Sequence, residues 1–282
     1  MLPDVSIIII NYNTFEFTSN CIRSVYNYTK NIEFEIIVVD NASIECDPAL
    51  LLVQFPHIML VKSDKNLGFA GGNNLGIAYA TGKYILLLNS DTELVENSIK
   101  FIYDKCRLLT DLGAATIRVT YPDGRAQPVA QYFPHAGFHF LDTSRLSRVF
   151  KKYCSTKRPV LDYTKSFVAD WVSGAFYFFP RKNLKQVGGK LSENFYMYVE
   201  DMEWSLLFSK AGLKNYYFSE SHIIHHEGKS WGSDQDKKIK TVHVSYLRFI
   251  KMYNGIFSSY VIAILLKVSV LKRFISKRLK GS

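Results

Sequence analysis

The feature that most constrains the fold is a series of short apolar runs that alternate with helix-like segments. Four runs are of strand length: residues 5–10, 35–39, 58–61 and 84–88. Continuous apolar runs of this kind are typical of strands buried on both faces. The segments with helical spacing are residues 15–28, 73–80 and 99–109. The alternation predicts βαβ units, and therefore an α/β fold with a mainly parallel, Rossmann-like sheet flanked by helices.

Polar residues follow three of these strands at the point where each strand ends. Asn11 follows the first strand, Asp40 the second, and the sequence Asn89-Ser90-Asp91 the fourth. Ligands of open α/β sheets bind beyond the carboxyl ends of the strands. We therefore expect these polar side chains to converge on one crevice.

The alternation weakens in the second half of the chain. Prolines and glycines interrupt residues 118–170, which predicts a loop-rich insertion beside the site or an ordinary peripheral layer. Residues 145–157 are basic and are expected to be exposed. Beyond them, residues 172–179 are predicted to form a strand and residues 201–211 a helix.

The net charge of +10 lies at the C-terminal end of the chain. Residues 237–282 contain 11 Lys or Arg and no Asp or Glu, which leaves 24 basic and 25 acidic residues elsewhere. A nearly neutral body gives no indication of nucleic-acid binding. A basic segment beside apolar residues instead indicates an anionic membrane surface.

The C-terminal segment is expected to be helical. Residues 252–266 carry no charge, but this run of 15 is shorter than the roughly 20 residues that span a bilayer. Residues 266–275 continue an apolar stripe among lysines and arginines, which is the pattern of an interfacial amphipathic helix. A helix docked on the body with a solvated basic end is the alternative. We expect one domain over residues 1–230 and a basic, membrane-associating helical segment over residues 231–282.

Cysteine spacing and the N-terminus suggest a compartment. Cys21, Cys46, Cys106 and Cys154 show no paired spacing, which favours free thiols in a reducing environment. A strand-like run begins at once, without a basic leader or cleavage site. The chain is therefore expected to be cytoplasmic.

Two candidate binding features lie in the first third of the chain. Asp40 could accept hydrogen bonds from a nucleobase or ribose, although Asp-Asn-x-Ser is also a common turn. Residues 66–74 (NLGFAGGNN) allow close backbone approach and precede a helix start that could bind an anion. The same segment could simply be a turn before a helix, and it is neither a dinucleotide nor an ATP motif.

A third candidate is Asp91. A carboxylate just past a buried strand can hold Mg²⁺ or Mn²⁺ that bridges a diphosphate. The alternative is that Asp91 caps the helix that follows.

Further candidates are acidic and imidazole side chains late in the chain. Glu200 and Asp201 are adjacent and point about 100° apart on a helix, so that one of them could act as a general base. Glu203 could merely complement the helix dipole. His225, in a cluster with His222 and His226, could complete a metal's coordination shell, although single histidines are usually structural.

Seven motifs in their order resemble a known family more specifically than any one of them does. They are VSIIIINYN, EIIVVDNAS, NLGFAGGNNLGI, YILLLNSDTEL, WVSGAFYFFPR, FYMYVEDMEWSLLFSKAG and HHEGKS. Together they resemble family 2 glycosyltransferases of the GT-A fold, over about residues 4–230. The similarity is greatest to rhamnosyltransferase-like bacterial enzymes that build O-antigen or capsule.

The resemblance implies a role for each motif residue. Asp201 would be the catalytic base, and Asp91 and His225 would hold the metal; Asn89 stands where the family's DxD motif often has its first Asp. The nucleotide- and donor-binding residues would be Asn11, Tyr12, Asp40, Asn66, Gly72, Asn73, Asn89, Ser90, Trp171, Ser173, Gly174 and Glu200.

The implied reaction is an inverting sugar transfer. Asp201 would deprotonate the acceptor hydroxyl as it attacks the anomeric carbon, while the metal stabilises the leaving diphosphate. dTDP-rhamnose is the first candidate donor, followed by UDP- and GDP-sugars, and a lipid-linked glycan is the expected acceptor. An inactive binding or scaffolding homologue and a nucleotidyltransferase are the alternatives.

Overall fold

The protein has an α/β fold built on one nine-stranded sheet, shown by a computed structural model that describes residues 2–135, 137–138, 156, 158–227 and 235–266. The first four strands pair in parallel in the order β3-β2-β1-β4. They are β1 (Val5–Asn11), β2 (Phe34–Asp40), β3 (Met59–Lys62) and β4 (Tyr84–Asn89). This arrangement confirms the predicted sheet and is consistent with a GT-A fold.

The second half of the sheet is mixed. It continues from β4 in the order β10-β6-β11-β5, and β8 pairs with β11. These strands are β5 (Thr92–Leu94), β6 (Leu112–Thr120), β8 (Phe167–Ala169), β10 (Phe176–Pro180) and β11 (Lys214–His225). β7 (Ala130–Gln131) and β9 (Trp171–Val172) form a separate two-stranded sheet.

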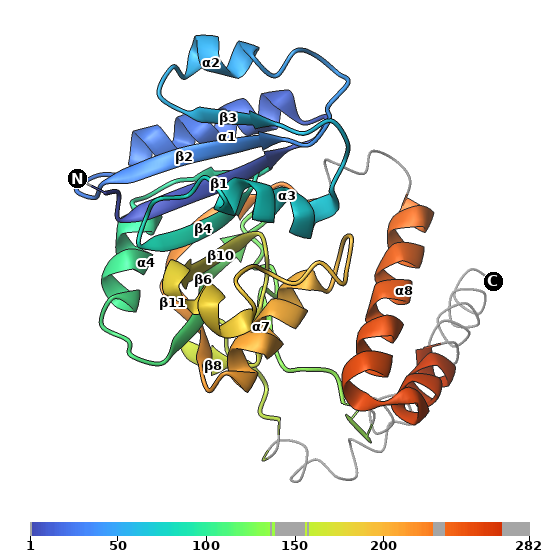
Figure 1. Ribbon diagram of the computed structural model, residues 1–282. Coiled ribbons are helices and arrows are strands. Elements are labelled where there is room, and N and C mark those ends of the chain that lie inside the picture. The colour runs from blue at the N-terminus through green and yellow to red at the C-terminus, as the bar shows by residue number, and fades with distance from the viewer. Residues whose placement is uncertain (1, 136, 139–155, 157, 228–234, 267–282) are drawn as a thin grey trace, which may run out of the picture.

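Helices cover both faces of the sheet, with α1 and α4 on one face and α3 and α7 on the other (Figure 1). The helices are α1 (Phe15–Tyr28), α2 (Leu50–Gln54), α3 (Gly68–Ile77), α4 (Ser98–Cys106), η2 (Arg181–Val187), α7 (Glu200–Lys210) and α8 (Gln235–Asn254). Ile7, Ile8 and Ile9 of β1 are fully buried between the two helical layers. Continuous burial on both faces explains why the strand has no polar alternation.

Two of the expected elements differ from the structure. The glycine-rich segment is the first turns of α3, rather than a turn before a helix that starts at residue 73. Glycine is required there because α3 lies against β1. A Cβ on Gly76 would come within 2.6 Å of Ile8, and one on Gly72 within 3.0 Å of Ile10.

The strand expected over residues 172–179 is two strands. β9 ends at Val172 and β10 begins at Phe176. The break exists because β9 leaves the main sheet to pair with β7, while Gly174 turns its backbone N–H toward Asp201.

The uncharged C-terminal run is not one helix. α8 ends at Asn254, Gly255 has a φ of 87°, and residues 256–266 form a second helix. No helix within the described part of the chain is long and apolar enough to cross a membrane. The basic stretch 145–157 (apart from residue 156), the stripe beyond residue 266, Cys154 and the proposed boundary at residue 230 lie outside the described residues.

α8 packs on the body beside α7. Phe249 and Ile250 of α8 are buried in a cluster with Phe195 and Met202, and Ile262 of the following helix joins it.

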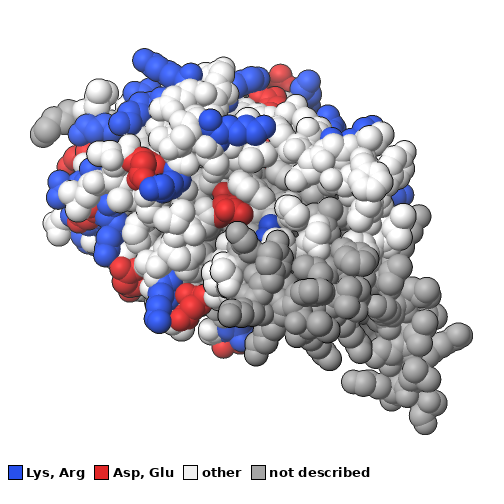
Figure 2. Space-filling view, turned by 90° about the horizontal axis from the view of Figure 1, so that it is seen from below, with Lys and Arg blue, Asp and Glu red and all other residues white. Residues whose placement is uncertain are grey.

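On the face seen in Figure 2, basic and acidic side chains of the described residues are interspersed and do not form a patch of one sign.

Candidate active site

The ends of β1 and β2 carry a closed network of buried polar groups. The register places Asn11 beside Asp40. The Asn11 amide donates to Asp40 Oδ1 over 2.8 Å, and the backbone N–H of Ser43 donates to Oδ2 over 3.2 Å. The Thr18 hydroxyl donates to Asn11 Oδ1 over 2.9 Å. Asp40 therefore holds the ends of β1 and β2 together through the hydrogen bonds that it accepts.

A cavity of about 500 Å³ lies beyond the carboxyl ends of β1 and β4. Eleven of the fifteen predicted site residues line it: Tyr12, Asn66, Asn89, Ser90, Asp91, Trp171, Ser173, Gly174, Glu200, Asp201 and His225. The other four, Asn11, Asp40, Gly72 and Asn73, are not among its lining residues. Asn11 and Asp40 brace the strand ends behind it, and Gly72 and Asn73 are buried inside α3.

One rim of this cavity is the segment that leads into α3. Asn66 Oδ1 accepts the Asn41 amide over 3.0 Å and the backbone N–H of Gly68 over 2.8 Å. Gly68 has a φ of +72°, and a Cβ there would come within 2.3 Å of the Tyr196 carbonyl oxygen. The rim is thus tied to the loop that leads into α7, because Phe69 also donates its N–H to that carbonyl.

Asp91 lies in the turn between β4 and β5. It does not cap α4, whose N-cap residue is Asn97. Asp91 Oδ1 lies 3.1 Å from Nε2 of His225, and their side chains are only 8% and 9% exposed. The preceding Ser90 hydroxyl hydrogen-bonds that of Thr14 over 3.1 Å.

Gln127 orients the His225 ring. Its amide nitrogen donates to the His225 backbone carbonyl over 2.8 Å, so its Oε1, at 2.8 Å from Nδ1, accepts the Nδ1 proton. Nε2 therefore faces Asp91, and it also lies 3.4 Å from the side-chain amide nitrogen of Asn89. A histidine whose second nitrogen donates to a carbonyl in this way is arranged as metal-binding histidines are.

An amide oxygen completes the donor groups on this side of the cavity. Asn89 Oδ1 is buried and has no hydrogen-bond partner among the described residues. Within the same residues, no three His, Cys, Asp or Glu side chains group together as a metal site. The local donor set is therefore one carboxylate, one imidazole and one amide.

The other two histidines of the predicted cluster have separate partners. His222 Nδ1 lies 3.1 Å from Glu96, and His226 Nε2 lies 3.0 Å from Glu93. Of the three, only His225 lines the cavity. His222 lies three residues earlier on β11, so it points to the opposite face of the sheet, and His226 follows the end of that strand.

The opposite wall is the start of α7, which follows strained backbone. Tyr198 and Val199 have φ values of 65° and 75°. Left-handed conformations of residues other than glycine cost about 1–3 kcal/mol each, and they cluster at functional sites. This geometry directs Glu200 and Asp201 into the cavity.

Asp201 is held by two backbone donors. Gly174 donates its N–H to Oδ2 and Met202 its own to Oδ1, each over 2.8 Å. Burial raises the pKa of Asp201, while these donors favour its ionised form. Gly174 must stay glycine, because a Cβ there would come within 2.9 Å of the Phe69 ring.

Glu200 is the more strongly perturbed of the two acids. Burial, and then the neighbouring Asp201 charge, raise the pKa of Glu200 well above its ordinary value. Its Oε2 is buried without a partner among the described residues. Glu200 therefore retains its proton to higher pH than Asp201, and Asp201 carries the negative charge of the pair.

Comparison with known proteins identifies the family. Residues 6–177 match the family model described as "Glycosyl transferase family 2". The chain belongs to that family. Enzymes of this family use nucleotide-sugar donors and glycan or lipid-linked acceptors.

Three of the chain's curated relatives have names that refer to the synthesis of glycans or to sugar transfer. An N-acetylglucosaminyl-diphospho-decaprenol L-rhamnosyltransferase of Mycobacterium tuberculosis is 24% identical over 76% of this chain and 74% of its own length. An O-antigen biosynthesis protein of Myxococcus xanthus is 25% identical over 82% of this chain but only 18% of its own. A low-salt glycan biosynthesis hexosyltransferase of Haloferax volcanii is 28% identical over 72% and 61%.

Sequence patterns did not indicate every residue of the glycosyltransferase's cavity. Gln127 lies in the proline-interrupted segment, and Val242 and Tyr246 lie on α8. No motif marks them. Only the packing of distant segments against one another brings them to the site.

Proposed function

We propose that this glycosyltransferase is a metal-dependent, inverting enzyme that transfers a sugar, rhamnose as the first candidate, to a lipid-linked glycan in bacterial surface polysaccharide synthesis. The supporting observation is that Asp201 and the pair formed by Asp91 and His225 line one cavity from different elements. The name of the mycobacterial relative supports both rhamnose and a diphosphate-linked lipid acceptor.

Asp91, His225 Nε2 and Asn89 Oδ1 would hold a Mg²⁺ or Mn²⁺ ion. The fit rests on the unpartnered buried Asn89 oxygen and on the His225 nitrogen that faces Asp91. Mg²⁺ in proteins is often bound by one or two carboxylates together with substrate phosphates, so a small protein donor set is sufficient. When bound, the ion offsets the charge of the departing nucleoside diphosphate.

Asp201 takes the proton of the acceptor hydroxyl as that oxygen attacks the anomeric carbon. The new bond joins the acceptor oxygen to the anomeric carbon, and the bond from that carbon to the diphosphate breaks with its electron pair. A single displacement on the face opposite the leaving group inverts the anomeric configuration. The raised pKa of Asp201 brings the base closer to neutral pH, where proton transfer is most efficient.

The donor would lie between the strand ends and α7. Tyr12 and Asn66 line the side of the cavity nearest β1 and β2, where the nucleoside is expected. dTDP-sugars are tested first, followed by UDP- and GDP-sugars.

The test is cleavage of a panel of nucleotide sugars with Mg²⁺ or Mn²⁺ and a lipid-linked glycan acceptor. Release of nucleoside diphosphate supports the transferase, and chelation of the metal should abolish it. Asp201→Asn should lower the rate by about 10²–10⁴-fold, and a cooperative thermal unfolding transition of the variant checks that it is folded. An undiminished Asp201→Asn rate would remove the assigned base. Pyrophosphate release from a nucleoside triphosphate would favour a nucleotidyltransferase. If no nucleotide sugar is cleaved, an inactive binding or scaffolding homologue is favoured.

We further propose that the C-terminal helices associate with the anionic, cytoplasmic face of the plasma membrane. The helix over residues 256–266 exposes Ile256, Phe257, Tyr260 and Ile264, of which Phe257 is 79% exposed. These positions recur at helical spacing, so they share one side of the helix. Exposed apolar residues next to basic ones are typical of interfacial helices.

Sedimentation with vesicles of phosphatidylglycerol and phosphatidylcholine tests this association. Phe257→Ser together with Ile264→Ser should reduce the bound fraction several-fold, since each apolar side chain contributes about 1.5–3 kcal/mol on burial. Ile44→Ser, at a residue that is 90% exposed on the far end of the chain, is the control and should bind as the unmodified protein does. Equal sedimentation of all three proteins would contradict the proposal.

A further inference from the structure

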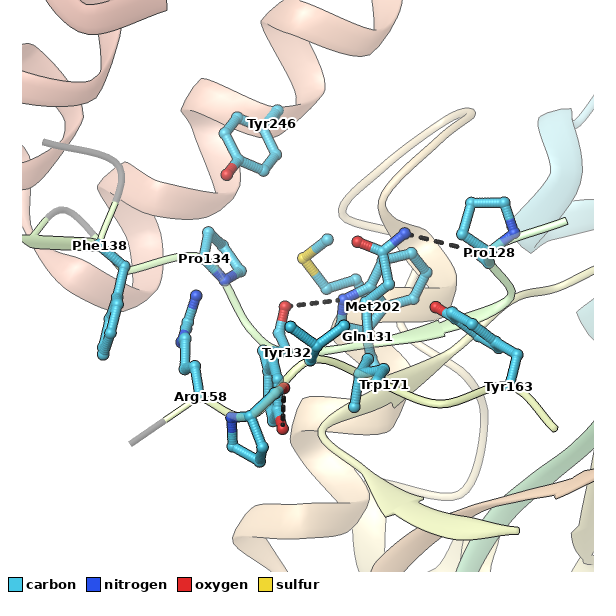
Figure 3. Close-up of a pocket in the computed structure, with 13 residues that line it drawn as sticks. Pro128, Gln131, Tyr132, Pro134, Phe138, Arg158, Tyr163, Trp171, Met202 and Tyr246 are labelled. Carbon is cyan, nitrogen blue, oxygen red and sulfur yellow. Dashed lines mark hydrogen bonds between the residues drawn. The ribbon is translucent and has the colours of Figure 1, made fainter. Parts of the chain in front are cut away.

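Figure 3 shows a second cavity, of about 620 Å³, which shares lining residues with the active-site cavity. Its lining comes from the loop-rich segment after β6, from β9 and α7, and from α8. Pro128, Trp171, Met202 and Tyr246 line both cavities. The two spaces therefore share a wall, and Met202 is the residue next to Asp201.

Aromatic rings in fixed orientations form much of this second cavity. The Trp171 indole N–H donates to the Tyr132 carbonyl over 3.2 Å. The Tyr132 hydroxyl donates to the Pro159 carbonyl over 3.1 Å, and that of Tyr163 to the Ala130 carbonyl over 2.5 Å. Because the N–H and hydroxyl groups of these rings are hydrogen-bonded to backbone carbonyls, it is the apolar parts of the rings that line the cavity.

Arg158 is the one charged residue among those that line this cavity. Its guanidinium lies 4.6 Å from the ring centre of Phe138 and 5.4 Å from that of Tyr132, and it donates to the Phe133 carbonyl. The described lining contains no Asp or Glu. A guanidinium has five N–H donors in a planar fork that matches phosphate oxygens. This cavity therefore combines aromatic rings with one cation and no competing carboxylate.

The apolar helix of the C-terminal segment belongs to the same region. Ile262 is fully buried in the cluster that contains Met202, against which Trp171 and Tyr246 also pack. Figure 3 shows Tyr246 reaching from α8 across the cavity from Tyr132. Met202, the residue next to Asp201, and Ile262 of the helix over residues 256–266 therefore belong to one apolar cluster beside this cavity.

We propose that this second cavity binds the acceptor, and that the acceptor carries a phosphate or diphosphate next to its terminal sugar. The sugar lies against Trp171 with a hydroxyl toward Asp201, the phosphate pairs with Arg158, and the lipid continues toward the helix over residues 256–266. This assignment rests on the proposed transferase function and adds the cavity that binds the acceptor and the residue that pairs with its phosphate.

Calorimetric binding of two matched compounds tests the proposal, with Mg²⁺ and a nucleoside diphosphate filling the donor side. One compound is N-acetylglucosamine joined to an octyl chain through a diphosphate; the other is octyl N-acetylglucosaminide. The unmodified protein should bind the diphosphate compound roughly tenfold or more tightly than the glycoside. Arg158→Gln should remove that preference and leave glycoside binding unchanged.

Arg248→Gln is the matched control, because Arg248 also lies over a ring, that of Phe195, but lines neither cavity. It should keep the preference, and equal Tm values for the three proteins confirm folding. Equal affinity of the unmodified protein for both compounds, or a preference that survives Arg158→Gln, overturns the proposal. Nucleotide-sugar cleavage by the unmodified protein is measured separately, so that failure of the transferase function is distinguishable from failure of the acceptor site.

Discussion

The ends of β1 and β2, which lie behind the active-site cavity, and the α7 wall of that cavity satisfy their buried polar groups in different ways. On the strand side, both oxygens of Asp40 accept hydrogen bonds, and the amide of Asn11 is bonded at both its nitrogen and its oxygen. On the α7 side, Glu200 and Glu203 each have a buried oxygen without a partner among the described residues. Buried polar groups are normally paired, so an unpaired carboxylate oxygen beside a cavity calls for an explanation, and a functional role is one.

We call the paired polar groups at the ends of β1 and β2, around Asn11 and Asp40, the platform. We call the start of α7, with Glu200, Asp201 and Glu203, the reactive wall. The platform is built from neighbouring parallel strands whose ends meet by register, so that its polar groups pair with one another. The reactive wall depends on strained backbone before α7 and on support from α8. Substitutions in the platform should therefore cost stability, whereas substitutions on the reactive wall should alter function, pH dependence and the attachment of α8.

The largest stability effect is expected for Asp40→Ala. It leaves the Asn11 amide and the Ser43 N–H without their buried acceptor, which should lower the free energy of unfolding by about 2–4 kcal/mol. Urea denaturation measures the change. Asp64→Ala, at an exposed aspartate, is the control and should leave the unfolding midpoint unchanged. Equal midpoints for the two variants would mean that the platform does not rely on this network.

The platform is also the part that could be predicted from the sequence. Its strands are continuous apolar runs, and Asn11, Asp40 and Asp91 follow their ends directly. Local order along the chain is enough to place them, because parallel strands align their carboxyl ends. The bounds of α1 came out as predicted for the same reason, since its apolar spacing is local.

The reactive wall could be predicted only in part. The acidic pair at Glu200 and Asp201 was expected, but Gln127 and Tyr246 were not, because long-range packing alone brings them to the cavity. The predicted start of α3 was wrong, because its glycines are needed where the helix lies close to β1 and do not form a turn before it. Such contacts have no signature in the order of residues along one segment.

A smaller effect is expected for Tyr253→Phe, which tests whether α8 supports the reactive wall. The Tyr253 hydroxyl donates to Glu203 Oε1, and the Asn194 amide is a second donor to the same oxygen over 2.8 Å. Losing the hydroxyl should cost about 1–2 kcal/mol and make α8 more susceptible to trypsin.

Tyr260→Phe is the control for that prediction, since Tyr260 is 65% exposed. It should change neither the unfolding midpoint nor the rate of cleavage. If Tyr253→Phe also left both unchanged, α8 would be held by its apolar cluster alone, and the hydrogen bond to Glu203 would carry no weight in the comparison.

The smallest expected effect is on pH dependence, through Glu200→Gln. Since the folded-state pKa of Glu200 is raised, the native state binds more protons than the unfolded state above about pH 4.3, and stability falls as pH rises through the raised pKa. Gln cannot ionise, so the variant does not lose this stability. Its free energy of unfolding, relative to that of the unmodified protein, should therefore rise by on the order of 1 kcal/mol between pH 5 and pH 8. Thermal unfolding at both pH values, with exposed Glu16→Gln as control, measures the gain. A gain that is the same for both variants would show that Glu200 is ionised without penalty, and the reactive wall would then resemble the platform.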